Sequence, residues 1–286
     1  MSGRKKLFWS LFSLGLAALS IWAVMSQSKK WSLGDIVESL RQADPLWLLA
    51  AIACTVLFVV LEGVALSVLL KGIGYRQPLS HCMLYSTSDI YFSAITPSAT
   101  GGQPASAYFM VKDGVPAGAA TVTLLVNLIL YTLSLIILGL VSVIFWPGLF
   151  FGLSTVSRIL IGLGFVIQVG LTILFFVLLG KGPAVFDLLR RFVRFLHGKK
   201  LIHRLEHRLK KLDSAQEEYE TCARIMKGKS SVFLRALVWN TLQRGLQLAV
   251  PMCIYLALGG EWKHAGVLFA SQCRVVLGYA PVPVPP

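Results

Sequence analysis

The sequence predicts an all-α polytopic membrane protein, and three observations carry this prediction. Hydrophobic residues make up 56% of the 286 residues and charged residues only 14%, with a mean hydropathy of +0.71. An ordinary soluble domain has roughly 45–50% apolar and about 25% charged residues. The apolar residues gather in runs of about 20 residues or more, the length that crosses a bilayer as a helix. These runs lack the alternation of polar and apolar residues that is typical of membrane β-barrels.

The same composition excludes several other classes of protein. Lys and Arg number 27 and Asp and Glu 13, so the formal charge is +14. The high apolar content excludes a disordered or collagen-like chain. The five cysteines include no C-x-x-C pair, and four of them lie in apolar or re-entrant-looking segments. We therefore expect no disulfide, and neither a metal site nor a cofactor is indicated.

Six apolar runs are long enough for transmembrane helices. The first, residues 7–25, contains no charge and follows a short basic segment. No small-residue cleavage site follows it, so we expect a retained helix rather than a signal peptide. In lipid, a helix satisfies its own backbone hydrogen bonds, and we expect a helix at each run. The remaining five runs cover residues 46–70, 119–146, 149–180, 232–258 and 264–280.

Basic residues predict the orientation of these helices. The N-terminus carries three basic residues before its first span, and residues 181–231 hold 13 Lys and Arg against 6 Asp and Glu. The positive-inside rule places both segments in the cytoplasm. This arrangement requires that the chain between the second and third spans does not cross the membrane. We therefore expect residues 82–111 to form a re-entrant or interfacial segment.

The basic cytoplasmic segment, residues 181–231, has the pattern of an amphipathic helix over residues 184–212. Leu201, Leu205, Leu209 and Leu212 recur at steps of four, four and three, with cationic residues on the other faces. Such a helix lies at the membrane surface and attracts anionic headgroups. A docking surface for anionic lipid or for tRNA is the alternative interpretation, because basic charge binds phosphate in either molecule.

One short motif in this segment matches a zinc-binding pattern. The residues from His203 to His207 have the H-x-x-E-H spacing, in which two histidines bind zinc and the glutamate acts as a base. Cationic neighbours disfavour a bound dication, and no third ligand is evident nearby. We interpret these side chains as solvated residues of a charged face, and we expect no metal site.

The stretch from Thr96 to Pro104 is rich in helix-breaking residues and lies between apolar segments. Irregular backbone at membrane depth is tolerated only where it is buried in protein or lines a wet cavity. Paired glycines allow close approach, and exposed backbone N–H groups can hold a phosphate. A functional re-entrant loop is favoured over a simple surface turn because the topology requires one. Its candidate binding residues are Thr96, Ser98, Thr100, Gly101, Gly102 and Gln103.

A second breaker-rich stretch runs from Gly278 to Pro286 and again follows an apolar run. Paired segments of this kind indicate a transporter site built from two halves. A helix that begins near His264 would emerge with no partner behind it. We therefore expect that the sequence is cut short or altered at this end.

Charged residues also fall within the apolar runs, at Glu62, Arg158, Arg235, Arg244 and Arg274. The two nearest to span ends, Arg158 and Arg235, can extend to the membrane surface. The other three lie deeper, where a charge costs at least about 2.5–3.5 kcal/mol. One interpretation is an internal ion pair between Glu62 and an arginine. The other is a polar cavity in which arginine binds a lipid phosphate and Glu62 pairs with a cationic headgroup, with Asp89 in this cavity or on the surface.

These residues resemble a known family. The run from Ile95 to Pro104, followed by Ala107-Tyr108 and by Lys112-Asp113-Gly114-Val115-Pro116, resembles the membrane domain of bacterial lysylphosphatidylglycerol synthase/flippases, the multiple peptide resistance factors. The resemblance extends from about residue 10 to the end, where residues 281–283 are similar to a second family motif. It implies that the loop at residues 96–104 lines a lipid cavity. It also implies a multi-pass protein of the bacterial plasma membrane with a cytoplasmic N-terminus.

The resemblance implies work on lipids and leaves three functions open. The first is binding of lysylphosphatidylglycerol or its translocation to the outer leaflet, which gives resistance to cationic antimicrobial peptides. The second is a phosphatidylglycerol lysyltransferase that uses lysyl-tRNA, although residues 181–231 are too short and too basic for its soluble catalytic domain. The third is a partner subunit of a separate soluble synthase. Catalytic residues stay unassigned, and the expected partners are anionic and aminoacylated phospholipids, with a homo-oligomer also allowed.

Overall fold

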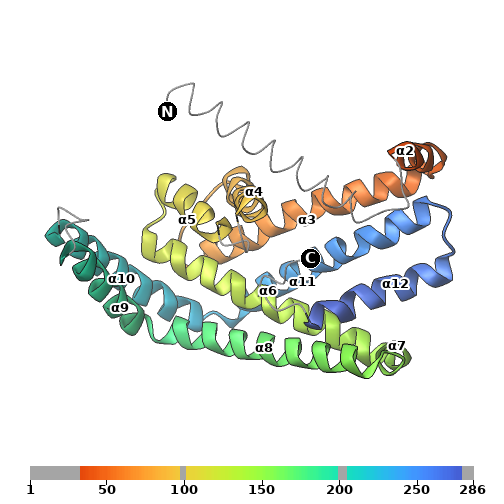
Figure 1. Cartoon of the computed structure of the whole chain (residues 1–286). Helices are drawn as coiled ribbons and strands as arrows, with labels where there is room; N and C mark the ends of the chain where they lie inside the picture. Colours follow the sequence, from red (N-terminus) through yellow and green to blue (C-terminus); the bar gives the residue numbers. More distant parts are fainter. Residues whose placement is uncertain (1–32, 97–100, 199–204, 279–286) are drawn as a thin grey trace.

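The computed structural model describes residues 33–96, 101–198 and 205–278, and within these ranges the fold is all-α (Figure 1). The chain forms a succession of α-helices and ends in one short 3₁₀ helix, with no strand among the described residues. The all-α prediction is therefore confirmed. The first predicted span, residues 7–25, lies outside the described residues.

Three helices are long and apolar enough to cross a membrane, among the residues that the structure describes: α3 (Pro45–Gly72), α6 (Ala117–Phe145) and α8 (Thr155–Gly180). They match the spans predicted at residues 46–70, 119–146 and 149–180. The run predicted at residues 149–180 begins as a separate short helix, α7 (Pro147–Phe151), because Pro147 follows the end of α6 and Ser154 caps the start of α8.

Two further helices fall at the remaining predicted spans. Helix α11 (Ser230–Ala257) is 28 residues long but carries several polar side chains. Helix α12 (Trp262–Val275) has 14 residues, fewer than the roughly 20 that cross a bilayer, and continues into the 3₁₀ helix η2 (Val276–Gly278). The total of six spans therefore stays a prediction.

Helices α3 and α11 pack antiparallel along their whole lengths. At one end the Asp44 N–H donates to the Ala257 carbonyl oxygen at 2.8 Å, and at the other Lys229 Nζ donates to the Gly72 carbonyl oxygen at 2.8 Å. A Cβ atom at Gly72 would lie 2.6 Å from a methyl group of Val232, so any larger residue would force this side chain to move. Close packing through small residues is how helices associate in lipid, where the hydrophobic effect between them is weak.

Helix α6 lies at the centre and is joined to its neighbours by polar side chains. Asn240 of α11 donates to Asn127 at 3.2 Å, and Thr172 of α8 contacts Thr132 at 3.0 Å. Apolar residues elsewhere on α8 remain exposed, with 67% of Val156 and 65% of Val166 accessible. An exposed apolar face of this kind indicates contact with a membrane or with a partner. Because α8 is apolar enough to cross a membrane, we infer that this face contacts the hydrocarbon core of the bilayer.

Helices α4 (Leu79–Ile95) and α5 (Gly102–Lys112) form a hairpin that is too short to span a membrane twice. Its base is fastened at Asp113, whose Oδ2 accepts from the Tyr85 hydroxyl at 2.7 Å and lies 2.8 Å from His81 Nδ1. The next residue, Gly114, has a φ of 88°, which turns the chain into α6. The hairpin thus brings the chain back to the end of the bundle at which α3 finishes, and α6 begins there. How deeply the hairpin enters the membrane stays a prediction.

The basic segment folds into two helices rather than one continuous helix over residues 184–212. Helix α9 (Gly182–Gly198) packs beside α10 (Leu205–Lys227). Arg190 joins them, with Nη2 2.8 Å from Asp213 Oδ1. The Tyr219 hydroxyl of α10 donates to the Leu178 carbonyl oxygen at 3.0 Å. Burial raises the pKa of this hydroxyl to about 12.

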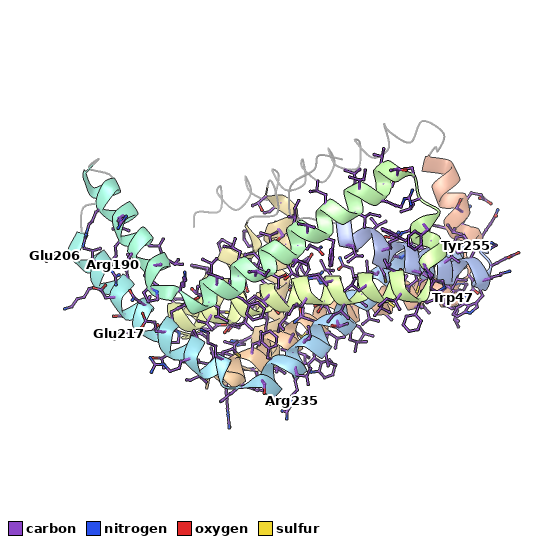
Figure 2. All side chains as sticks on the ribbon, turned by 90° about the horizontal axis from the view of Figure 1, so that it is seen from below. Trp47, Arg190, Glu206, Glu217, Arg235 and Tyr255 are labelled. Atoms are coloured by element: carbon purple, nitrogen blue, oxygen red, sulfur yellow. The ribbon has the colours of Figure 1, made fainter. Side chains whose placement is uncertain are left out.

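The two ends of the bundle differ in chemistry. Figure 2 shows Arg190, Glu206 and Glu217 on the α9–α10 pair, with Trp47 and Tyr255 at the opposite end. There, the ring centroids of Trp47 and Trp262 lie 5.6 Å apart. Tryptophan is enriched where helices meet the membrane surface, so this pair marks the end opposite the basic helices. Helix α2 (Leu33–Gln42) precedes α3 at that end.

Candidate functional site

A polar cavity of about 360 Å³ lies between α3, the α4–α5 hairpin, α6 and α11. We call it the central cavity. Its depth follows from the helices that form it, since Glu62 lies ten residues from the end of α3, about 15 Å of helix rise. Tyr131 and Arg244 likewise lie near the middle of α6 and α11. The lining residues are Phe58, Glu62, Asp89, Ile90, Ser93, Gln103, Asn127, Leu128, Tyr131, Arg244 and Gln247.

Arg244 is the cation of the central cavity. Its guanidinium lies 4.0 Å from the Tyr131 ring centroid and 5.3 Å from that of Phe58. Its Nη1 donates to Gln247 Oε1 at 2.6 Å, while Nε has no hydrogen-bond partner in the described part of the chain. Aromatic faces attract a guanidinium and fix its orientation without using its N–H donors. Arg244 is therefore held in place along the wall of the central cavity.

Glu62 is a buried carboxyl group without a close counterion. It is 4% exposed, and Ser86 and Gln243 lie beside it. Across the described ranges, no arginine nitrogen comes within 4.0 Å of it, and its Oε2 has no hydrogen-bond partner. The predicted ion pair with an arginine is therefore not formed. An unpaired buried charge is costly, and at membrane depth it is a sign of function.

Asp89 is the second carboxyl group of the central cavity, and it is well held. Its Oδ2 accepts from Gln103 Nε2 at 2.9 Å, and its Oδ1 from the Ser93 hydroxyl at 3.4 Å. A Cβ atom at Gly102 would lie 1.9 Å from Asp89 Oδ1 and 2.5 Å from the Asp89 carbonyl oxygen. Gly102, the first residue of α5, therefore lets the positive end of that helix approach the carboxylate.

Thr96 and Gly101 close the turn between α4 and α5. The Thr96 hydroxyl accepts from the Gly101 N–H at 2.9 Å and donates to the Phe92 carbonyl oxygen at 2.6 Å. Both of its hydrogen-bonding directions are thus used within the turn. These two candidates shape the hairpin and do not line the cavity, whereas Gln103 does. Ser98 and Thr100 lie outside the described residues.

Arg274 lies away from the central cavity. Its side chain is 7% exposed and donates through Nη1 to the Leu149 carbonyl oxygen of α7. The following residues pack between α6 and α8, where Gln168 Nε2 donates to the Val276 carbonyl oxygen at 3.0 Å. A Cβ atom at Gly139 would lie 2.2 Å from Leu277, so a glycine on α6 makes room for η2. Residues 279–286 of the second breaker-rich stretch lie outside the described residues.

The structure therefore brings together three of the predicted residues, Glu62, Gln103 and Arg244. The structure also places Asp89 in this cavity, whereas the sequence left open whether Asp89 lies in the cavity or on the surface. Tyr131 was missed because an aromatic residue in an apolar run carries no functional signal.

Comparisons with known proteins identify a family for this chain. A family model described as "Lysylphosphatidylglycerol synthase TM region" matches residues 10–286. Searches among curated proteins and among solved structures found no match.

Proposed function

Because this chain belongs to the lysylphosphatidylglycerol synthase transmembrane family, we propose that it binds lysylphosphatidylglycerol in the central cavity and moves it across the membrane. Membership of the family makes it a membrane protein of lysylphosphatidylglycerol metabolism. The observation that carries the finer proposal is the set of charges in the central cavity, one cation and two carboxyl groups near the middle of the long helices.

The charges of this lipid complement those of the central cavity. Its headgroup has one phosphate and two ammonium groups, on the α and ε carbons of the lysyl residue. Arg244 supplies a planar donor group that suits a phosphate. Glu62 and Asp89 supply one carboxyl group for each ammonium. A ligand of this kind would also supply the partner that Glu62 Oε2 lacks among the described residues.

We propose that the lipid moves outward, away from the basic α9–α10 end. We place this end in the cytoplasm of a bacterium, by the positive-inside rule. Movement of the lipid from there to the outer leaflet reduces the negative surface charge of the cell. This reduction repels cationic antimicrobial peptides, so the proposal includes resistance to them. A soluble synthase that makes the lipid is the partner that this scheme needs.

The test measures lysylphosphatidylglycerol in the outer leaflet with an amine reagent that does not cross membranes. Cells that make the lipid through a separate synthase express the parent chain or the Glu62→Gln, Asp89→Asn or Arg244→Gln variant. Each variant should lower the outer-leaflet fraction about tenfold or more, since removing one partner of a desolvated charge pair costs about 2–5 kcal/mol.

Total lipid and a matched variant complete this test. Arg235→Gln changes an exposed arginine on the same helix that does not line the central cavity, and it should leave the leaflet distribution unchanged. Unchanged distribution in all three cavity variants would refute the proposal. A fall in total lysylphosphatidylglycerol would instead favour the lysyltransferase alternative.

A further inference from the structure

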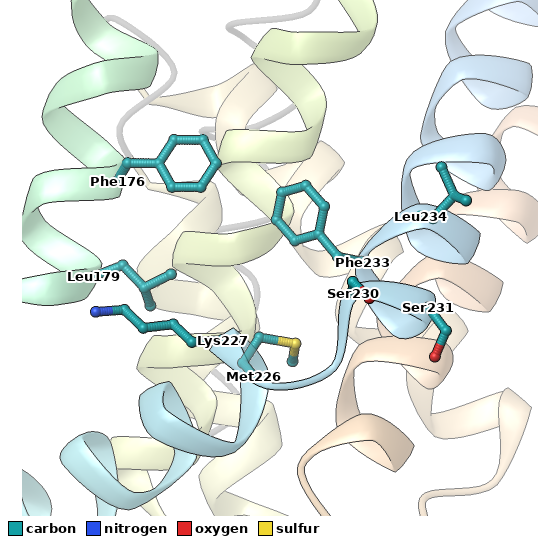
Figure 3. Close-up of a pocket in the computed structure, with 8 residues that line it drawn as sticks. All are labelled: Phe176, Leu179, Met226, Lys227, Ser230, Ser231, Phe233 and Leu234. Atoms are coloured by element: carbon teal, nitrogen blue, oxygen red, sulfur yellow. The ribbon is translucent and has the colours of Figure 1, made fainter.

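We propose a second lipid site, in which an anionic phospholipid of the basic-side leaflet binds between α8, α10 and α11. A groove of about 730 Å³ opens there, and we call it the α8–α11 groove (Figure 3). It shares no lining residue with the central cavity, so this proposal does not depend on translocation. The residues that carry the argument are Phe176, Leu179, Lys227, Ser230, Phe233 and Leu234.

The walls of the α8–α11 groove suit an acyl chain. Phe176 of α8 and Phe233 of α11 face each other across it, with ring centroids 6.0 Å apart (Figure 3). Phe176 remains 43% exposed and Leu234 62% exposed, so apolar surface is left for a ligand to cover. Leu179 is buried on the α8 side. An acyl chain in this position would cover the exposed apolar surface of Phe176 and Leu234, which neither α8 nor α11 covers.

The mouth of the groove suits a phosphate group. Lys227 reaches from the end of α10 toward Leu179, and Ser230 begins the first turn of α11 (Figure 3). Both residues are exposed, and no carboxylate lines the groove. Charge complementarity therefore selects an anionic ligand over a neutral or cationic one.

The position of the groove selects a lipid over a free anion. It lies where α8 ends and α11 begins, so its polar mouth is at the level at which these helices leave the hydrocarbon. Its apolar walls extend from there along the lipid-facing side of α8. A soluble phosphate would use only the mouth, whereas a phospholipid fills the mouth and the walls together.

Native mass spectrometry of the purified chain tests the proposal, with phosphatidylglycerol as the probe and phosphatidylcholine as the neutral comparison. The Arg244→Gln background reduces binding in the central cavity. In it, Lys227→Gln should weaken phosphatidylglycerol retention about fivefold, the effect of one cationic contact at the membrane surface. Phosphatidylcholine retention should not change. Ser230→Phe should also lower phosphatidylglycerol retention, because its ring obstructs the groove without changing the charge.

Lys210→Gln is the matched control, because Lys210 is an exposed lysine of α10 that does not line the groove. It should retain as much phosphatidylglycerol as the background protein, and inorganic phosphate should not displace the lipid. Equal losses in the Lys210 and Lys227 variants would show attraction by overall charge and overturn the proposal. Full retention in the Lys227 and Ser230 variants, with unchanged melting temperatures, would also overturn it.

Discussion

The two carboxyl groups of the central cavity are held in opposite ways. Asp89 accepts hydrogen bonds from Gln103 and Ser93 and lies against the first residue of α5. Glu62 is more deeply buried, and within the described ranges one of its oxygens has no partner. Asp89 is thus positioned by the hairpin, whereas the described residues leave one oxygen of Glu62 unsatisfied.

Gly102→Ala should destabilise the protein and displace Asp89. The new Cβ atom would meet the Asp89 carboxyl and carbonyl oxygens, and overpacking of this kind costs about 1–3 kcal/mol. The melting temperature in detergent and the outer-leaflet lipid assay should both fall. Gly170→Ala is the control, because a Cβ atom there meets nothing within 4 Å and alanine favours a helix. Equal melting temperatures for Gly102→Ala and the parent would contradict this account.

At the scale of elements, the α4–α5 hairpin forms one wall of the central cavity. Hydrogen bonds and an ion pair at Asp113 stabilise the end of the hairpin that leads into α6. Asp113 contacts Tyr85 and His81 there, while Gln77 donates to the Asp113 carbonyl oxygen at 3.2 Å. The Tyr85 ring is fully buried, so its hydroxyl depends on this partner. This polar cluster therefore fixes the position of the hairpin. It thereby sets where Asp89 and Gln103 lie relative to α3 and α11.

Asp113→Ala should loosen the hairpin. It leaves the buried Tyr85 hydroxyl without its acceptor, at a cost of about 1–3 kcal/mol. Hydrogen exchange should increase in α4 and α5 more than in α3. Asp187→Ala removes an exposed carboxylate that pairs with Arg190 and should cost no more than about 1 kcal/mol. Uniform exchange throughout the bundle after Asp113→Ala would count against a local role.

At the scale of the whole molecule, two chemically different ends are separated by apolar helices. The α9–α10 pair makes one end basic, and the Trp47–Trp262 pair marks the other. Since α3 and α11 run antiparallel and α6 runs from the basic end, every long helix has one end in each region. This arrangement predicts which residues each side of the membrane can reach.

Labelling of single cysteines tests that orientation. In a cysteine-free background, Lys263→Cys places an exposed thiol near the tryptophan end and Lys210→Cys places one on α10. A maleimide that does not cross membranes should label residue 263 in intact cells, and residue 210 only after lysis. Labelling of residue 210 in intact cells would show that the α9–α10 end faces outward and would contradict this orientation.

The sequence predicted the long apolar helices closely because their ends carry strong signals. Asp44-Pro45 starts α3 within one residue of the predicted span, and the Trp146-Pro147 step ends α6. It did not predict the break between α9 and α10, because the leucine spacing continues across it.

The central cavity was only partly predictable for a different reason. Glu62 and Arg244 are conspicuous as charges in apolar runs, so burial alone marks them. Which residues of α6 face them depends on how α6 packs between α3 and α11, and one sequence does not contain that information. Arg274 is likewise a charged residue within an apolar run, yet its side chain donates to a backbone carbonyl oxygen of α7 and lies away from the cavity.

The size of the central cavity has a consequence for selectivity. Its volume of about 360 Å³ is near the lower end of the range for small-molecule pockets, about 300–1,000 Å³. It has room for a polar head and none for two fatty tails. A lipid that passes as we propose would therefore carry only its headgroup through the cavity, while its acyl chains stay in the bilayer. Recognition would then depend on the head and be indifferent to tail length and saturation.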